Sequence, residues 1–115
     1  MPAPLTYLAL DGTAEITRTV EMVRTRFNHP RLHISLVVPT FARRTKLAAE
    51  ILEKLREHFP KQMSKAVLGY SVKIDQAQSR SQTIFEYAPR SPAANWLRSV
   101  AEELLEREPQ AARRE

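Results

Sequence analysis

The fold is decided by residues 32–59, which read LHISLVVPTFARRTKLAAEILEKLREHF. The run LHISLVV (32–38) is apolar and β-branched, and prolines bound it on both sides, which predicts a short strand buried on both faces. A helix is expected over residues 43–59, where apolar side chains recur at helical spacing. Its inward-facing residues are predicted to be Leu47, Ile51, Leu52, Leu55 and Phe59.

The residues before this unit predict an extended segment and a helix. Residues 1–10 contain Pro2 and Pro4, which cannot donate to a strand ladder, so we expect an edge strand or an extended arm there. Asp11 or Thr13 is expected to cap a helix that ends before Pro30. The inward face of this helix is predicted to comprise Ile16, Val20, Val23 and Phe27.

After the central unit, the sequence predicts a third strand over residues 65–72. Residues 73–88 are polar, and we expect an irregular stretch with one helical turn near 75–79 and extended backbone over 83–87. Ser91 followed by Pro92 is typical of a helix start.

The last helix is expected to pack Trp96 into the core and to leave Glu102, Glu103 and Glu106 on a solvated face. Residues 109–115 are expected to form a frayed tail after a single domain over residues 1–108.

The order of elements predicts the fold class. Strands and helices alternate along the chain, which requires crossover connections between parallel strands. We therefore expect an α/β fold: a small two-layer or three-layer domain whose mainly parallel sheet of about three to four strands is flanked by helices.

Composition and charge narrow the possible partners. The 18 lysines and arginines exceed the 13 acidic residues, which gives a formal net charge of +5. Such an excess favours acidic partners, nucleic acid above all, although evenly spread charge would serve only solubility. No apolar run approaches the roughly 18 residues of a membrane span, so no membrane partner is expected.

The residue types that common catalytic and cofactor sites require are scarce. Cysteine is absent, and the two glycines, Gly12 and Gly69, lie outside any glycine-rich loop that could cradle a triphosphate. The sequence therefore predicts no phosphate cofactor, no catalytic residues and no metal. His29, His33 and His58 lack the spacing of metal ligands. Ser35, Ser71 and Ser79 have no visible base partner and no nucleophile motif around them.

Four stretches together resemble a known family. They are YLALDGTAEITRTV (7–20), LVVPTFARRTKLAAEILEKLREHF (36–59), VLGYSVKIDQAQSRSQTI (67–84) and EYAPRSPAANWLRSVAEELL (86–105). In order and spacing they are similar to segments in the C-terminal half of ParA-type partition ATPases of the ParA/MinD superfamily. The 115 residues hold no counterpart of that family's phosphate-binding loop. Gly69 and Tyr70 stand where the family has a proline and an arginine near the adenine.

The resemblance implies nonspecific DNA contact through Arg44 and Lys73, which match basic positions of the family. Arg43, Lys46 and Arg80 lie close to them in sequence and complete the predicted DNA-binding set. As an alternative, these cations could belong to a solvated helix start or to a protein contact. Cations near a helix N-terminus are electrostatically unfavourable, so their presence at this position favours a functional role. Phosphate contacts carry no base information, so sequence-independent binding is expected.

Two functions follow from this comparison. The first is a non-catalytic, ParA-like protein that acts in DNA, plasmid or cargo partitioning by binding DNA and by self-association. The alternative is an interaction module that docks on or regulates a full-length ParA-type ATPase without binding DNA. A third possibility that the sequence leaves open is an enzyme fragment whose nucleotide site is completed by a partner chain. A cytoplasmic location is expected, and nucleoid association is left open. Tyr70 and Tyr87 are expected to pack in the core or at its rim rather than to stack on bases.

Overall fold

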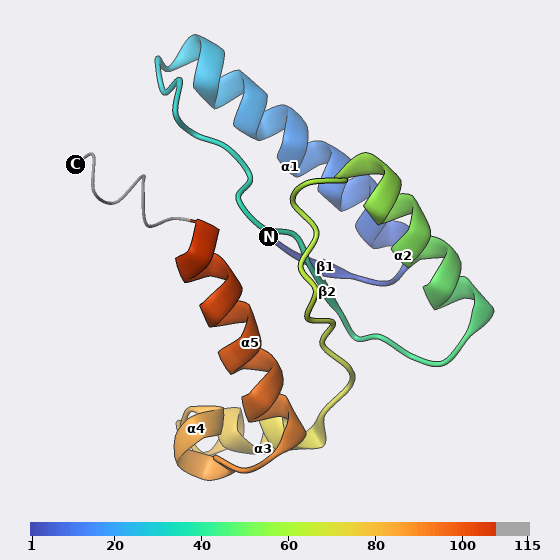
Figure 1. Ribbon diagram of the computed structural model, residues 1–115, viewed down its shortest axis with the longest axis vertical. Helices are drawn as coiled ribbons and strands as arrows, with labels where there is room; N and C mark the ends of the chain where they lie inside the picture. The colour runs from blue at the N-terminus through green and yellow to red at the C-terminus, as the bar shows by residue number, and fades with distance from the viewer. Residues whose placement is uncertain (108–115) are drawn as a thin grey trace.

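The computed structural model describes residues 1–107, and two strands and five helices follow one another along the chain (Figure 1). The elements are β1 (Pro2–Pro4), α1 (Tyr7–Arg26), β2 (Val38–Thr40), α2 (Lys46–His58), α3 (Val72–Ser79), α4 (Ile84–Tyr87) and α5 (Pro92–Arg107). The predicted α/β class is confirmed, with a smaller regular sheet than expected. The tail predicted over 109–115 lies outside the described residues.

The regular sheet consists of β1 and β2, which are parallel with Ala3 opposite Pro39. The amide of Val38 donates to the Met1 carbonyl, and the amide of Leu5 donates to the Thr40 carbonyl. Backbone hydrogen-bonding groups point alternately to the two sides of a strand, so those of Pro2 and Pro4 point away from β2. On that side no strand within residues 1–107 accepts a hydrogen bond from β1, and the missing amide hydrogens of the two prolines cost nothing. The edge-strand prediction is confirmed for residues 2–4.

The predicted strand over 65–72 is wrong in detail. Residues 63–69 run beside β2, where Val37 pairs with Met63 and Ala42 pairs with Gly69 as isolated parallel bridges. Between the two bridges the ladder is interrupted, and there the Ser64 hydroxyl donates to the Ala66 carbonyl. The predicted strand over 32–38 is likewise reduced to its last residue, since residues 32–36 extend past the end of β1.

Helix α1 begins earlier than predicted. The Thr6 hydroxyl accepts a hydrogen bond from the Ala9 amide at 3.3 Å and caps the helix, so neither Asp11 nor Thr13 is the cap. The predicted inward face is also wrong at two positions, because Ile16 is 45% exposed and Phe27 is 65% exposed. Much of the apolar stripe on α1 therefore has no cover among the described residues.

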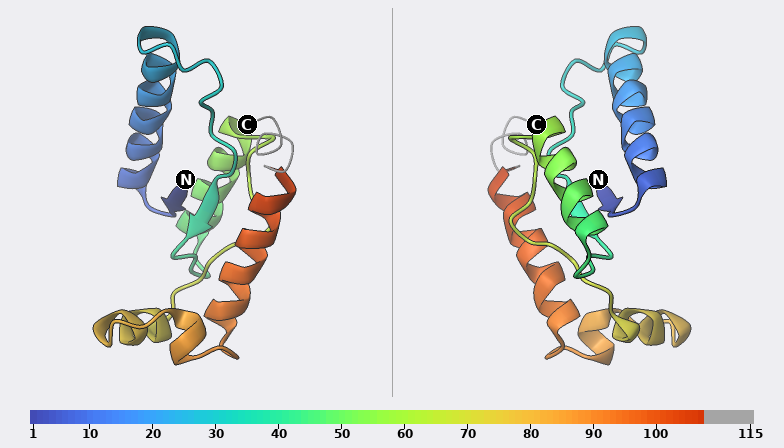
Figure 2. Two further views of the ribbon diagram at one scale, coloured as in Figure 1. Left: turned by 90° about the vertical axis from the view of Figure 1, so that its left-hand side faces the viewer. Right: turned by 90° about the vertical axis from the view of Figure 1, so that its right-hand side faces the viewer.

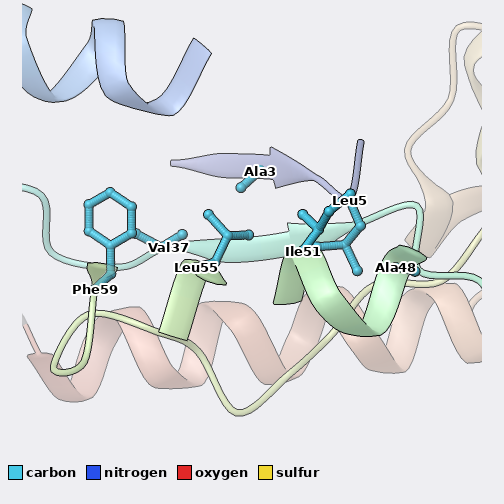
Figure 3. Close-up of a cluster of buried hydrophobic side chains, with 7 residues drawn as sticks. All are labelled: Ala3, Leu5, Val37, Ala48, Ile51, Leu55 and Phe59. Carbon is cyan, nitrogen blue, oxygen red and sulfur yellow. The ribbon is translucent and has the colours of Figure 1, made fainter. Parts of the chain in front are cut away.

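The main core lies between α2 and one face of the sheet. Figure 3 shows the side chains of Ile51 and Leu55 reaching from α2 toward β1 and β2, among the buried residues of this cluster. Its members are Ala3, Leu5, Val37, Ala48, Ile51, Leu55 and Phe59. The prediction for α2 is confirmed for its buried positions and is wrong for Leu47, which is 43% exposed.

The opposite face of the sheet is an open apolar groove. Leu36 and Val38, which alternate with Val37 of the core, line it from the sheet. Ile16 lines it from α1 and Leu97 from α5, and its volume is about 570 Å³. Figure 2 shows α1 and α5 standing apart on either side of the strands. We call this surface the open groove.

A second, smaller core joins α3, α4 and α5. Its buried members are Ala77, Ile84, Ala93 and Ala94. The extended backbone predicted for 83–87 is wrong: these residues form α4 and its cap, Thr83, which makes a capping box with Glu86. The predicted start of α5 is confirmed, with the Ser91 hydroxyl accepting from the Ala94 amide at 3.3 Å.

Helix α5 is tied to residues 61–66 by two charged side chains. The carboxylate of Glu103 accepts hydrogen bonds from the amides of Lys65 at 2.7 Å and Ala66 at 3.1 Å. The guanidinium of Arg107 donates to the Lys61 carbonyl at 2.6 Å. The solvated role predicted for Glu103 is therefore wrong, because this carboxylate holds backbone amides that the interrupted ladder leaves unpaired.

Trp96 of α5 is half-buried and contacts the chain beside β2. A Cβ built on Gly69 would lie 3.0 Å from the Trp96 ring, so a glycine at this position lets the indole approach the backbone closely. None of the helices within residues 1–107 combines the length and the hydropathy that a membrane crossing requires.

Candidate nucleic-acid interface

Two loops leave the sheet at the same end, and predicted basic residues lie in or directly after them. The Ala42 amide donates to the Leu68 carbonyl at 3.0 Å, and Ala42 pairs with Gly69. The loop that leads into α2 and the segment that leads into α3 therefore start side by side (Figure 1). Parallel strands present their carboxyl ends at one edge, and there Phe41 and Arg43 of the first loop meet Tyr70 of the second.

Four of the five predicted residues belong to this end of the sheet. Arg43 and Arg44 lie in the loop before α2, Lys46 is the first residue of α2, and Lys73 lies in the first turn of α3. All four are exposed. We call the surface formed by Arg43, Arg44, Lys46 and Lys73 the basic rim.

The two helix starts add to the positive potential of the basic rim. Thr45 caps α2 by accepting from the Ala48 amide at 3.1 Å, and the first turn of α2 contains no acidic residue. Ser71 precedes α3 but makes no side-chain capping bond, which leaves the first amides of that helix available. Helix N-termini carry partial positive charge and attract anions, so the start of α2 favours a negative ligand, whereas Asp75 in the first turn of α3 partly offsets this effect there.

The cations of the basic rim are not neutralised by carboxylates of the described chain. The ion pairs within residues 1–107 lie on α1 and α2, between Arg18 and Glu15, Arg24 and Glu21, and Arg56 and Glu53. The Arg43 guanidinium instead lies 5.2 Å from the centre of the Tyr70 ring. Within residues 1–107, no ion pair involves a cation of the basic rim.

Arg80 does not join this surface. It caps the C-terminal end of α3, and its guanidinium lies 5.4 Å from the centre of the Tyr87 ring. The helix separates it from Lys73 by seven residues, or about 10 Å along the axis. Arg80 therefore lies at the opposite end of α3 from Lys73.

An aromatic pair that the sequence did not indicate accompanies the basic rim. The rings of Phe41 and Tyr70 lie 5.5 Å apart, and both side chains are slightly more than half exposed. The expectation that Tyr70 packs in the core or at its rim is therefore wrong. Phe41 has a φ of 53°, a left-handed conformation that no local pattern in the sequence predicts.

Neither glycine is placed as a phosphate loop would require. Gly12 lies within α1, and Gly69 faces Trp96. No group of three histidine, aspartate or glutamate side chains within residues 1–107 comes close enough to hold a metal ion.

Comparison with known proteins points to one family, although no family model matches the chain. The chain is 36% identical over 108 residues to the chromosome-partitioning ATPase Soj of Thermus thermophilus. It is 30% identical over 107 residues to the cell division protein PomZ of Myxococcus xanthus. It is also 30% identical over 109 residues to the chromosome partitioning protein ParA of Caulobacter vibrioides.

These similarities cover nearly all of this chain but a minor part of each relative. The matches span 93%, 93% and 94% of this chain, and 43%, 34% and 40% of the three relatives. The resemblance drawn from the four sequence stretches is confirmed: over almost its whole length, this chain is homologous to a part of the ParA-type partition ATPases, consistent with their C-terminal region.

Proposed function

We propose that this chain is a non-catalytic, ParA-like protein that acts in the partitioning of DNA or of cargo by binding DNA without sequence preference and by associating with itself. The observation that carries the proposal is the basic rim. Arg43 and Arg44 lie in the loop that follows β2, Lys46 begins α2 and Lys73 lies in the first turn of α3; all four are exposed, and no carboxylate of the described residues pairs with them. The formal net charge of +5 adds a long-range attraction for DNA.

The chemistry of the rim suits phosphates rather than bases. Arginine, lysine and helix N-termini are the groups that proteins use for contacts with the DNA backbone, and such contacts fix position without reading sequence. The names of the relatives refer to chromosome partitioning and cell division, which agrees with a DNA-associated role.

The non-catalytic part of the proposal rests on the glycines. A loop that binds a polyphosphate needs glycines whose backbone amides point toward the phosphates. Here Gly12 lies within helix α1, and the side of Gly69 that lacks a Cβ faces the Trp96 ring. We therefore expect no magnesium-dependent ATP binding by this polypeptide, which isothermal titration calorimetry measures directly.

Charge reversal tests the assignment of the basic rim. The double variant Arg44→Glu with Lys73→Glu removes two phosphate contacts and introduces two repulsive charges, so binding to a mixed-sequence duplex should be lost at physiological salt. Fluorescence anisotropy with a labelled duplex gives the affinity, and circular dichroism verifies the fold.

The matched control is Arg31→Glu with Arg56→Glu. This variant changes the net charge by the same amount, but Arg56 lies in the last turn of α2, at the opposite end from Lys46, and Arg31 lies after α1. It should retain most of the affinity. Equal losses in the two variants would show that net charge alone attracts DNA and would refute the site.

The open groove supports a second candidate, an interaction module that docks on a ParA-type ATPase. Parallel sheets are normally covered on both faces, and here α2 covers one face while the other lines the open groove. The second candidate predicts a stable complex with a full-length relative and no DNA affinity at physiological salt. Retained DNA binding by the wild type would exclude it.

A further inference from the structure

We propose that the aromatic pair of Phe41 and Tyr70 is a stacking platform for unpaired bases, so that the basic rim prefers single-stranded DNA to duplex. This inference rests on the proposed DNA binding and names the form of nucleic acid that the same site takes. It does not depend on base sequence, because every base offers a face on which an aromatic ring can stack.

The exposure of the pair is the first argument. Phe41 is 52% exposed and Tyr70 is 54% exposed, although their rings lie 5.5 Å apart and contact each other at a tilt of 50°. Two neighbouring aromatic side chains that remain half in water leave apolar ring surface that a ligand can cover. Duplex DNA keeps its bases stacked inside the helix and offers little to cover it, whereas a single strand offers free base faces.

The backbone of Phe41 is the second argument. Its φ of 53° places a bulky residue in the left-handed region, a strained conformation that persists only where the surrounding structure holds it. Here the hydrogen bond from the Ala42 amide to the Leu68 carbonyl fixes the next residue. The chain thus holds the Phe41 side chain in the solvent beside Tyr70.

The cations around the pair are the third argument. The Arg43 guanidinium lies 5.2 Å from the centre of the Tyr70 ring, and Arg44 and Lys46 follow directly along the chain. A single strand bound here would place its phosphates on the basic rim and its bases on the rings. Aromatic platforms beside a positively charged surface are the usual means of holding single strands.

The test compares a labelled single strand of mixed sequence with the duplex of the same sequence, at equal salt, by fluorescence anisotropy. Wild type should bind the single strand more tightly. Phe41→Ala and Tyr70→Ala should each weaken single-strand binding about fivefold or more, from the stacking energy of one base, and should leave duplex binding within about twofold. The dependence on salt should not change, because neither substitution removes a charge.

The matched control is Phe85→Ala. Phe85 is also exposed, and the Arg98 guanidinium lies 5.1 Å from the centre of its ring, but this pair belongs to α4 and α5 and not to the two loops that carry Phe41 and Tyr70. Its loss should change neither affinity. Phe41→Leu keeps the apolar volume and removes the ring, so the same loss in this variant separates stacking from a folding defect.

A fluorescent variant gives an independent readout. In Phe41→Trp, the fluorescence of the introduced tryptophan should be quenched when the single strand binds and should change little when the duplex binds. Quenching of this kind requires a base in contact with the indole ring. Equal affinities of wild type for the two forms, or an equal effect of Phe41→Ala on both, would overturn the platform while leaving the proposed DNA binding intact. Absence of binding to either form would overturn both. Loss of self-association in Phe41→Ala with unchanged DNA affinity would show that the pair is covered by protein instead.

Discussion

The carboxylate of Glu103 joins α5 to the segment beside β2. Its two oxygens accept hydrogen bonds from the amides of Lys65 and Ala66, at 2.7 and 3.1 Å. Glu103→Gln keeps the shape of the side chain but replaces one acceptor by a donor, which leaves one of the two amides without its partner. We expect the free energy of unfolding to fall by about 1–3 kcal/mol, because these hydrogen bonds involve a charged group.

Urea unfolding followed by circular dichroism measures this effect, with Glu102→Gln as the control. Glu102 is exposed and immediately precedes Glu103 in the same helix, so its substitution should change stability by less than about 0.5 kcal/mol. Equal stabilities of Glu103→Gln and Glu102→Gln would contradict the bridging role of Glu103.

At the scale of elements, α2 is the helix that holds the sheet. Ile51 and Leu55 are 1% and 2% exposed against β1 and β2, whereas Leu47 on the same helix is 43% exposed. Ile51→Ala should lower the free energy of unfolding by about 2–5 kcal/mol, because it leaves a cavity in the core. Leu47→Ala removes apolar volume from a half-exposed position and should cost less than about 1 kcal/mol. Similar costs for the two substitutions, measured by urea unfolding, would place the core elsewhere.

The elements also show where sequence reasoning succeeded. The α/β class and helices α2 and α5 could be predicted, because their apolar spacing and the Ser91–Pro92 start are local signals. The capping box of Thr83 and Glu86 is an equally local signal, and it indicates a helix start where extended backbone is expected from the sequence.

The rest depended on contacts between distant parts of the chain. The interruption of the third strand involves Glu103, which lies 38 residues after Lys65. The two loops of the basic rim lie beside each other because Ala42 pairs with Gly69, a contact between distant parts of the sequence. Sequence spacing alone could group only Arg43, Arg44 and Lys46, which are neighbours along the chain. Arg80 enters the predicted set because it lies close to Lys73 in sequence, but α3 places the two residues at its opposite ends.

At the scale of the whole molecule, the open groove is the surface we expect to mediate self-association. Ile16 is 45% exposed and lines this groove, so Ile16→Lys should place a charge on the contact surface and shift the protein toward monomer. Sedimentation equilibrium should give a dimer for wild type at micromolar concentration and a monomer for the variant.

The control for self-association is Leu8→Lys. Leu8 lies on the same helix and is 83% exposed, but it does not line the open groove. This variant should remain dimeric. A wild-type protein that is monomeric at micromolar concentration would contradict the proposed self-association, and equal dissociation in both variants would contradict its assignment to the groove.

The central claim is that the basic rim binds DNA through its phosphates, and the salt dependence of wild-type binding tests it most directly. Four phosphate contacts predict that the logarithm of the affinity for a mixed-sequence duplex falls linearly with the logarithm of salt concentration, with a slope of about −4. Anisotropy titrations between about 50 and 200 mM salt measure that slope. A slope near zero, or no binding at the lowest salt, would contradict the account.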